Sequence, residues 1–204
     1  MIKVIFFDVG GVLMRSDYDF DTIYRKFGKA VGMDPKRCEA LHRYYREDML
    51  AGKCSARKFL GIVRREAKFK GDIKKVWVCV ALKYINLDPR LISLVDNLRK
   101  EYKIAMFSNI SEMRGYIDSA LDLYSHFDRS FLSYKLKIKK PDPKMFEYAL
   151  KKMKLRPGES ILIDDRERNL IVAKKTGIVP VHFQNRKQLT TDLKKLGINV
   201  IKKF

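Results

Sequence analysis

Short apolar segments alternate with helix-like segments through the second half of the chain, and this alternation restricts the fold more than any other property of the sequence. The strand-like segments are residues 103–107, 130–133, 160–163 and 178–183, and a further apolar run covers residues 2–7. Strands that are joined through helices form right-handed βαβ units, in which the strands run parallel. We therefore predict an α/β fold with a doubly wound, Rossmann-like parallel sheet that is buried on both faces.

Residues 16–85 have a different pattern, which is helical throughout. Asp34 and Pro35 form a favourable N-cap and first-turn pair, and Gly32, Gly52 and Gly71 divide the segment at helix-length intervals. We predict four helices and no strand in this segment. It would form a small helical domain inserted into an α/β core that consists of residues 1–15 and 86–204.

Three of the predicted strands end in polar side chains. One ends at Asp8, one at Ser108 and Asn109, and one at Asp164 and Asp165. The carboxyl ends of parallel strands lie along one edge of the sheet, where ligands of such folds bind. We therefore expect these side chains to converge, although they are far apart in the sequence.

This set of side chains suits phosphoryl transfer. A carboxylate such as that of Asp8 can attack phosphorus and form an aspartyl-phosphate, which divides hydrolysis into two easier steps. Neighbouring carboxylates repel one another unless a cation lies between them, and hard oxygen ligands beside a phosphate favour Mg²⁺. A hydroxyl from Ser108 and an ammonium from Lys140, which lies in a proline-rich and therefore rigid segment, can hold the remaining phosphate oxygens.

The same residues resemble the motifs of the haloacid dehalogenase-like hydrolase superfamily, above all its phosphatases with a helical cap inserted after the first strand. Over nearly the whole chain the motifs occur in order as Asp8 with Gly11-Val12-Leu13, Ser108, Lys140-Pro141-Asp142-Pro143, and Ile163-Asp164-Asp165 with Asn169. The resemblance implies that residues 16–85 are the cap. It also implies a Mg²⁺-dependent phosphohydrolase that acts on a small phosphorylated substrate.

The resemblance further implies a role for each matching residue. Asp8 would be the nucleophile, while Ser108 and Lys140 would be catalytic residues that hold the phosphoryl group. Asn109 would join them in binding the substrate through its backbone or side chain. The implied Mg²⁺ ligands are Asp8, the backbone carbonyl of Gly10, Asp165 as the direct carboxylate ligand, and Asp164 behind it or acting through water.

Gly10 departs from the family pattern, because phosphatases of this family usually carry a second aspartate there as general acid and base. Glycine has no side chain that can donate a proton, and loss of such a group typically lowers the rate about 10²–10⁴-fold. We expect slow hydrolysis, or a restriction to aryl, acyl or anomeric phosphates, whose leaving groups need little protonation. Alternatively, another residue or a group of the substrate supplies the proton.

Two rival functions follow from the same resemblance. A 2-haloacid dehalogenase also lacks the second aspartate, but such enzymes act without Mg²⁺ and do not need the carboxylate pair Asp164-Asp165. A non-catalytic relative that binds a phosphorylated ligand or a protein partner is the other alternative, and Gly10 is the sequence feature that favours it. Turnover of a phosphate ester separates the phosphohydrolase from both.

The net charge of +20 at pH 7 raises nucleic acids or acidic substrates as partners. The 44 basic residues are spread over both predicted parts of the chain, so we expect attraction of phosphorylated small molecules and no nucleic-acid contact. No apolar run approaches the ~20 residues of a membrane helix, and we expect no signal peptide, since the stretch after Met1 reads as a strand. Three cysteines without metal-site spacing fit a reducing compartment as buried small residues. We expect a cytoplasmic protein, whose substrate and oligomeric state the sequence leaves open.

Overall fold

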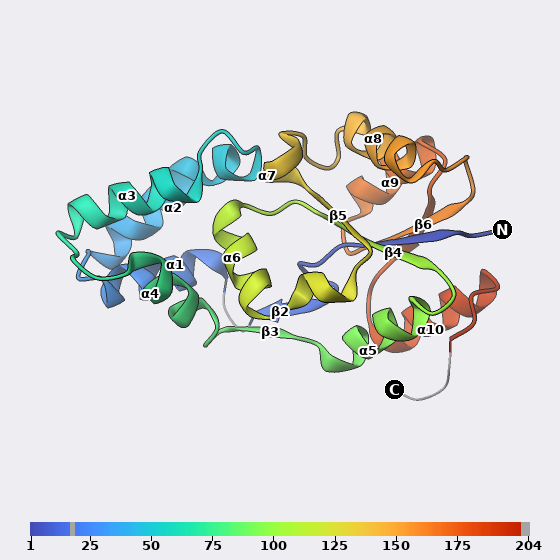
Figure 1. Ribbon diagram of the computed structural model, residues 1–204, viewed down its shortest axis with the longest axis horizontal. Coiled ribbons are helices and arrows are strands. Elements are labelled where there is room, and N and C mark those ends of the chain that lie inside the picture. Colours follow the sequence, from blue (N-terminus) through green and yellow to red (C-terminus); the bar gives the residue numbers. More distant parts are fainter. Residues whose placement is uncertain (17–18, 201–204) are drawn as a thin grey trace.

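A five-stranded parallel sheet forms the centre of the computed structural model, which describes residues 1–16 and 19–200 (Figure 1). Its strands are β1 (Val4–Phe7), β4 (Lys103–Ser108), β5 (Arg129–Leu132), β6 (Ser160–Asp164) and β7 (Val179–His182). The strand order is β5-β4-β1-β6-β7, and all neighbours are parallel. The first strand is therefore central, and the chain extends the sheet in both directions from it. The predicted doubly wound parallel sheet is confirmed.

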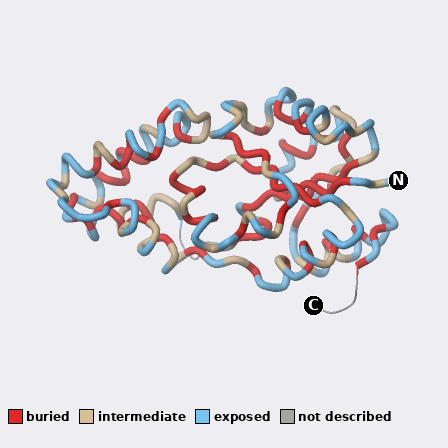
Figure 2. Tube along the Cα trace, in the orientation of Figure 1, coloured by how far each residue is buried: buried red, intermediate tan, exposed pale blue. Residues whose placement is uncertain are grey.

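Helices cover both faces of the sheet (Figure 1). They are α5 (Pro89–Leu98), α6 (Glu112–Ala120), α8 (Pro143–Met153), α9 (Glu167–Lys175) and α10 (Arg186–Lys195), with short turns η1 (Leu123–His126) and α7 (Ser133–Leu136). Val4 and Phe6 pack toward α8 and α9, whereas Ile5 and Phe7 point to the opposite face and join a larger cluster with α5, α6 and α10. The strands are consequently buried along their length (Figure 2). None of the described helices is both long and apolar enough to cross a membrane.

Four helices form a bundle beyond the carboxyl ends of the strands (Figure 1). They are α1 (Phe20–Ala30), α2 (Pro35–Leu50), α3 (Ala56–Glu66) and α4 (Ile73–Ala81). As predicted, Asp34 caps α2, because its side chain accepts a hydrogen bond from the backbone N–H of Arg37. Trp77 is fully buried, stacks on Tyr24 at 4.6 Å between ring centroids, and donates its Nε1–H to the carbonyl of Met113 in α6. The bundle therefore has its own aromatic core and a fixed contact with the α/β part.

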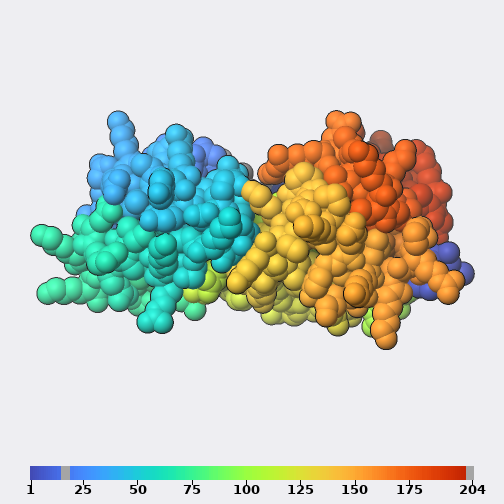
Figure 3. All heavy atoms as spheres, turned by 90° about the horizontal axis from the view of Figure 1, so that it is seen from above, coloured from blue at the N-terminus to red at the C-terminus, as the bar shows by residue number. Residues whose placement is uncertain are grey.

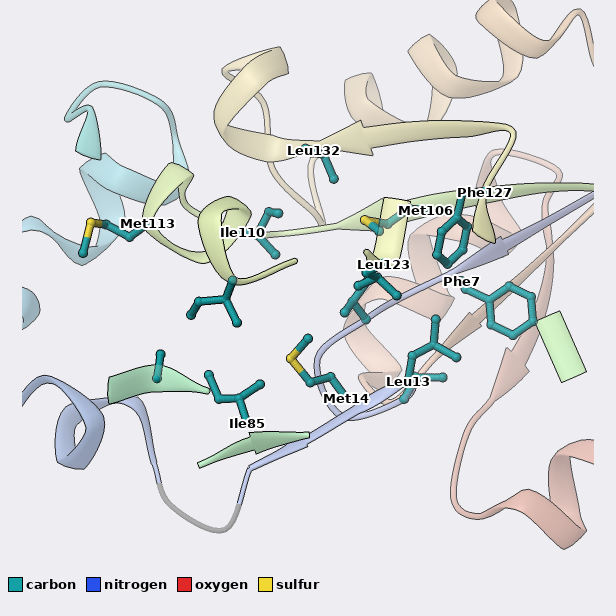
Figure 4. Packing of buried hydrophobic residues seen from close by; sticks show 14 of the residues in the cluster. Phe7, Leu13, Met14, Ile85, Met106, Ile110, Met113, Leu123, Phe127 and Leu132 are labelled. Carbon is teal, nitrogen blue, oxygen red and sulfur yellow. The ribbon is translucent and has the colours of Figure 1, made fainter. Parts of the chain in front are cut away.

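A two-stranded antiparallel ribbon joins the bundle to the sheet, and the prediction of no strand in residues 16–85 is wrong at the two ends of that segment, Ser16 and Ile85. Strand β2 (Met14–Ser16), which leads into the bundle, pairs with β3 (Ile85–Leu87), which leads out of it. The two connections between bundle and sheet therefore lie side by side. Met14 and Ile85 pack into the core beneath α6 (Figure 4). Strands of three residues are too short to show an alternating pattern in the sequence. Residues 17–18 of the expected insert and 201–204 of the expected core lie outside the described residues.

One part of the cysteine prediction is also wrong. Cys38 and Cys54 are buried, but Cys79 is exposed. Cys79 lies two residues after Trp77 on α4, and residues two apart on a helix face different directions. Because Trp77 points into the bundle, Cys79 points outward. The apolar composition of this helix did not reveal which side faces solvent.

Candidate active site

The carboxyl edge of the sheet gathers the polar residues that follow β1, β4 and β6. These three strands are direct neighbours, and Phe7 is in register with Met106 on one side and Ile163 on the other. The backbone N–H of Asp8 donates to the carbonyl of Ile163 at 2.9 Å, which extends the pairing by one residue. Asp8 therefore stands at the same edge as the ends of β4 and β6, as the sequence predicted.

Asp8 is buried and tightly oriented. Its Oδ1 accepts hydrogen bonds from the Ser108 hydroxyl and from the backbone N–H of Val9, both at 2.7 Å. Its Oδ2 lies 3.2 Å from Nζ of Lys140. Both oxygens of the carboxylate are thus held, and rotation of the side chain is restricted before any ligand binds.

The ammonium of Lys140 lies between two carboxylates. Besides its contact with Asp8, its Nζ donates to Oδ2 of Asp164 at 2.5 Å, and only 2% of the lysine is exposed. A charge buried to this degree is tolerated in a protein only when it is paired. The sequence predicted Lys140 as a phosphate-holding residue, but it did not predict that the lysine pairs with two acids.

Asn109 holds the backbone of Lys140. Its Nδ2 donates to the carbonyl of Lys140 at 2.7 Å, and its Oδ1 accepts from the N–H of Lys140 at 2.8 Å. The amide is therefore engaged at both ends, next to a cis peptide bond between Lys140 and Pro141. These two bonds give the side chain a positioning function. They leave its second N–H unused, and a contact of Asn109 with substrate stays a prediction.

Asp164 and Asp165 differ in their surroundings. Asp164 is fully buried and accepts hydrogen bonds from Lys140, from the N–H of Arg166 and from Asn169, whose Nδ2 lies 2.9 and 3.0 Å from the two carboxylate oxygens. In contrast, Oδ1 of Asp165 is buried and has no hydrogen-bond partner among the described residues. This difference fits Asp165 as the carboxylate that is available to an ion.

The three carboxylates form a site with excess negative charge. Asp8, Asp164 and Asp165 each present an oxygen within 4.8 Å of the others, and Lys140 is the cation in contact with the first two. Burial raises the pKa of Asp165, and the charges of Asp8 and Asp164 raise it further. Burial also raises the pKa of Asp164, against the opposing effect of Lys140. Three carboxylates and one ammonium leave two negative charges, which matches the charge and the oxygen preference of a Mg²⁺ ion.

Two adjacent glycines after Asp8 have different constraints. Gly11 has a φ of +81°, and a Cβ atom there would overlap Oδ2 of Asp165 and lie 2.7 Å from its Cγ. A Cβ atom on Gly10 would meet nothing within 4 Å. The turn that contains both glycines is closed by a hydrogen bond from the N–H of Met14 to the carbonyl of Val9 at 2.9 Å. Gly11 is therefore required by the site, whereas Gly10 leaves open space.

This contrast gives a matched pair of variants. Gly11→Ala is expected to lower the free energy of unfolding by about 2 kcal/mol or more, because alanine disfavours positive φ and its methyl group displaces Asp165. Gly10→Ala is expected to change it by less than about 0.5 kcal/mol, as for most uncrowded surface positions. Urea denaturation of both variants measures the difference. Equal stabilities would show that Asp165 is not packed against the loop.

Two supporting contacts were not predicted from the sequence. Asn169 belongs to a predicted motif without a predicted role, whereas the structure shows that this residue orients Asp164. The other contact is an ion pair between Lys139 and Glu47 of α2, which links the helical bundle to the segment beside the site. The position of Asn169 in the first turn of α9, five residues after the end of β6, was a usable signal. The pairing of Lys139 with Glu47 was not predictable, because the two residues are 92 positions apart in the sequence.

Known proteins resemble the chain over most of its length. A family model described as haloacid dehalogenase-like hydrolase matches residues 2–177. D-ribitol-5-phosphate phosphatase of Bacteroides thetaiotaomicron is 28% identical over 95% of this chain and 99% of its own length. Flavin mononucleotide hydrolase 1 of Arabidopsis thaliana is 29% identical over 63% of this chain and 53% of its own length.

A solved structure has the same fold. It is an enzyme of the haloacid dehalogenase family from Bacteroides thetaiotaomicron, in complex with magnesium and inorganic phosphate. The TM-score is 0.75 at 21% identity, with 90% of this chain and 95% of the other chain covered. At this level of identity the likeness concerns the fold.

Proposed function

The chain belongs to the haloacid dehalogenase-like hydrolase family, and on that premise we propose that it is a Mg²⁺-dependent phosphohydrolase acting on a small phosphorylated metabolite. The observation that carries the proposal is the arrangement around Asp8, whose carboxylate contacts both Ser108 and Lys140 at the edge of the sheet. The similarity to D-ribitol-5-phosphate phosphatase and flavin mononucleotide hydrolase supports it, because the first name describes a phosphatase and the second a hydrolase of a phosphorylated small molecule.

In the proposed reaction, an oxygen of Asp8 attacks phosphorus and the bond to the leaving-group oxygen breaks. Water then attacks the aspartyl-phosphate, which releases inorganic phosphate and regenerates the carboxylate. Ser108, which donates a hydrogen bond to Asp8 in the free protein, and Lys140, which forms an ion pair with it, turn to the phosphoryl oxygens when substrate is bound. Asp8, Asp165 and the Gly10 carbonyl would hold Mg²⁺, with Asp164 supporting them, and the bound ion would supply compensating positive charge.

The direct test compares two reactions under two conditions. The proposal requires hydrolysis of 4-nitrophenyl phosphate in the presence of Mg²⁺ and its loss in EDTA. The dehalogenase alternative requires halide release from 2-chloropropionate in both conditions. The carboxylate pair on β6, with a buried oxygen of Asp165 that lacks a partner among the described residues, favours the first outcome. Halide release without phosphate release would refute the phosphohydrolase.

Gly10→Asp tests whether a missing acid limits the rate. The space around Gly10 admits a side chain, so we expect the aspartate to fit and to protonate the leaving group. With an alkyl phosphate, whose leaving group needs a proton, kcat is expected to rise about 10–10²-fold. With 4-nitrophenyl phosphate the rise is expected to be much smaller, since nitrophenolate leaves without protonation.

Gly10→Asn is the matched control, because asparagine has nearly the same volume but no acidic proton. A rise in kcat with asparagine equal to that with aspartate would attribute the effect to the shape of the loop. Binding of BeF₃⁻ by the wild type and both variants, without turnover by any of the three proteins, would instead favour the non-catalytic relative. Steady-state kinetics with both classes of ester distinguish the outcomes.

The helical bundle completes the proposal as the cap of the enzyme. It consists of α1–α4, lies beyond the carboxyl ends of the strands, and is connected through the β2–β3 ribbon (Figure 1). A substrate at Asp8 would therefore be enclosed between bundle and sheet. A cytoplasmic location and the lack of a nucleic-acid contact stay predictions from the sequence.

A further inference from the structure

Glu47 and Lys139 form an ion pair at the junction between the helical bundle and the α/β part. Glu47 belongs to α2, and Lys139 directly precedes the buried Lys140 of the candidate site. In the space-filling view, the cyan surface of the end of α2 touches the gold surface of the segment after β5 (Figure 3). The ion pair therefore lies beside the site, on the side that faces the bundle.

Two arginines act on the same carboxylate. Arg46 precedes Glu47 in α2, and Arg168 lies in the first turn of α9, three residues after Asp165. The hydrogen bond from Lys139 lowers the pKa of Glu47, and the charges of Arg46 and Arg168 lower it further. Both arginines are exposed, and neither side chain has a hydrogen-bond or ion-pair partner among the residues that the structure describes. One ammonium in contact with Glu47 and two guanidinium groups whose charges act on it thus leave an excess of two positive charges.

The position of this cluster corresponds to the leaving-group side of the site. In phosphoryl transfer the leaving group points away from the nucleophile, roughly in line with it. Asp8 stands at the carboxyl edge of the sheet, and the bundle lies beyond that edge (Figure 1). A leaving group therefore extends toward the bundle, where Lys139 already pairs with the carboxylate of Glu47.

We propose that Arg46, Lys139 and Arg168 form a second anion-binding subsite, so that the enzyme prefers phosphate esters whose leaving group carries a carboxylate or a second phosphate. This inference rests on the proposed phosphohydrolase function and names its substrate class. An exposed ion pair contributes little alone, so the preference requires several cations that act together. Glu47 occupies the subsite in the free protein and competes with the anion of the substrate.

The test measures inhibition constants against hydrolysis of 4-nitrophenyl phosphate, which report affinity whether or not the competing ester is cleaved. The two probe pairs are 3-phosphoglycerate with glycerol 3-phosphate, and fructose 1,6-bisphosphate with fructose 1-phosphate. We expect the member with the additional anion to inhibit about 10-fold more strongly in at least one pair. Arg46→Gln and Arg168→Gln should each reduce this ratio, and Glu47→Gln should increase it.

Lys174→Gln is the matched control, because it removes one positive charge from the last turn of α9, the same helix as Arg168. It should leave the ratio unchanged, which separates the subsite from the general positive field of the protein. Equal inhibition constants within both pairs, or ratios that Arg46→Gln and Arg168→Gln do not alter, would overturn the subsite alone. If wild-type protein with Mg²⁺ does not hydrolyse 4-nitrophenyl phosphate, the proposed function fails and the subsite fails with it.

Discussion

Asparagine in place of Asp8 is expected to abolish hydrolysis of phosphate esters while the fold persists. The amide is too weak a nucleophile to form the covalent intermediate, so kcat should fall roughly 10⁴-fold or more. The packing should survive, because asparagine can still accept the hydrogen bonds from Ser108 and Val9, and Lys140 keeps Asp164 as its partner. Release of phosphate with Mg²⁺ measures the first effect, and thermal unfolding measures the second.

The same variant also tests the ion site. An ion that binds only the folded protein raises the unfolding temperature, so Mg²⁺ should stabilise the wild type. Asp8→Asn removes one of the three clustered carboxylates, and the stabilisation by Mg²⁺ should become smaller. Asp96→Asn is the matched control, because that carboxylate pairs with His126 away from the site and should change neither property. Turnover by Asp8→Asn comparable to the wild type would remove Asp8 from the role of nucleophile.

The convergence of the site could be predicted because it follows from topology. Once β1, β4 and β6 are taken as parallel strands of one sheet, their carboxyl ends share an edge whatever their distance in sequence. Asp8, Ser108 and Asp164 therefore had to lie near one another, and the structure places them so. The chemical type of these residues then restricted the reactions that are possible at this edge of the sheet.

The contacts among these residues could not be predicted in the same way. Hydrophobic periodicity tells which face of a strand or helix is buried, but it does not tell which polar groups meet. The two-sided clamp of Asn109 on the backbone of Lys140 depends on the path of a loop 31 residues later. The pairing of Lys140 with Asp164 depends likewise on how deeply the lysine is buried. Such features are properties of the tertiary structure and have no local signal in the sequence.

Methionine in place of Lys140 is expected to produce the largest loss of stability among the site variants. It keeps the length and the apolar stem of the side chain but leaves Asp8 and Asp164 buried without their shared cation. Removing one partner of a buried ion pair typically costs about 3–5 kcal/mol, and the free energy of unfolding in EDTA at pH 7.5 should fall by that amount. Lys144→Met, an exposed lysine at the start of α8, is the control and should have little effect.

The loss of stability in Lys140→Met should depend on pH and on Mg²⁺ in a defined direction. Burial already raises the pKa of Asp164 and Lys140 opposes this, so removal of the lysine raises that pKa further. A carboxyl group whose pKa is higher in the folded than in the unfolded protein stabilises the fold at low pH, and this contribution is lost as pH rises through the folded-state pKa. The difference in unfolding free energy between wild type and variant in EDTA should therefore be smaller at pH 5 than at pH 7.5. Mg²⁺ should restore part of the stability at pH 7.5, because it replaces the missing positive charge, whereas a deficit independent of both pH and Mg²⁺ would mean that Lys140 acts by packing alone.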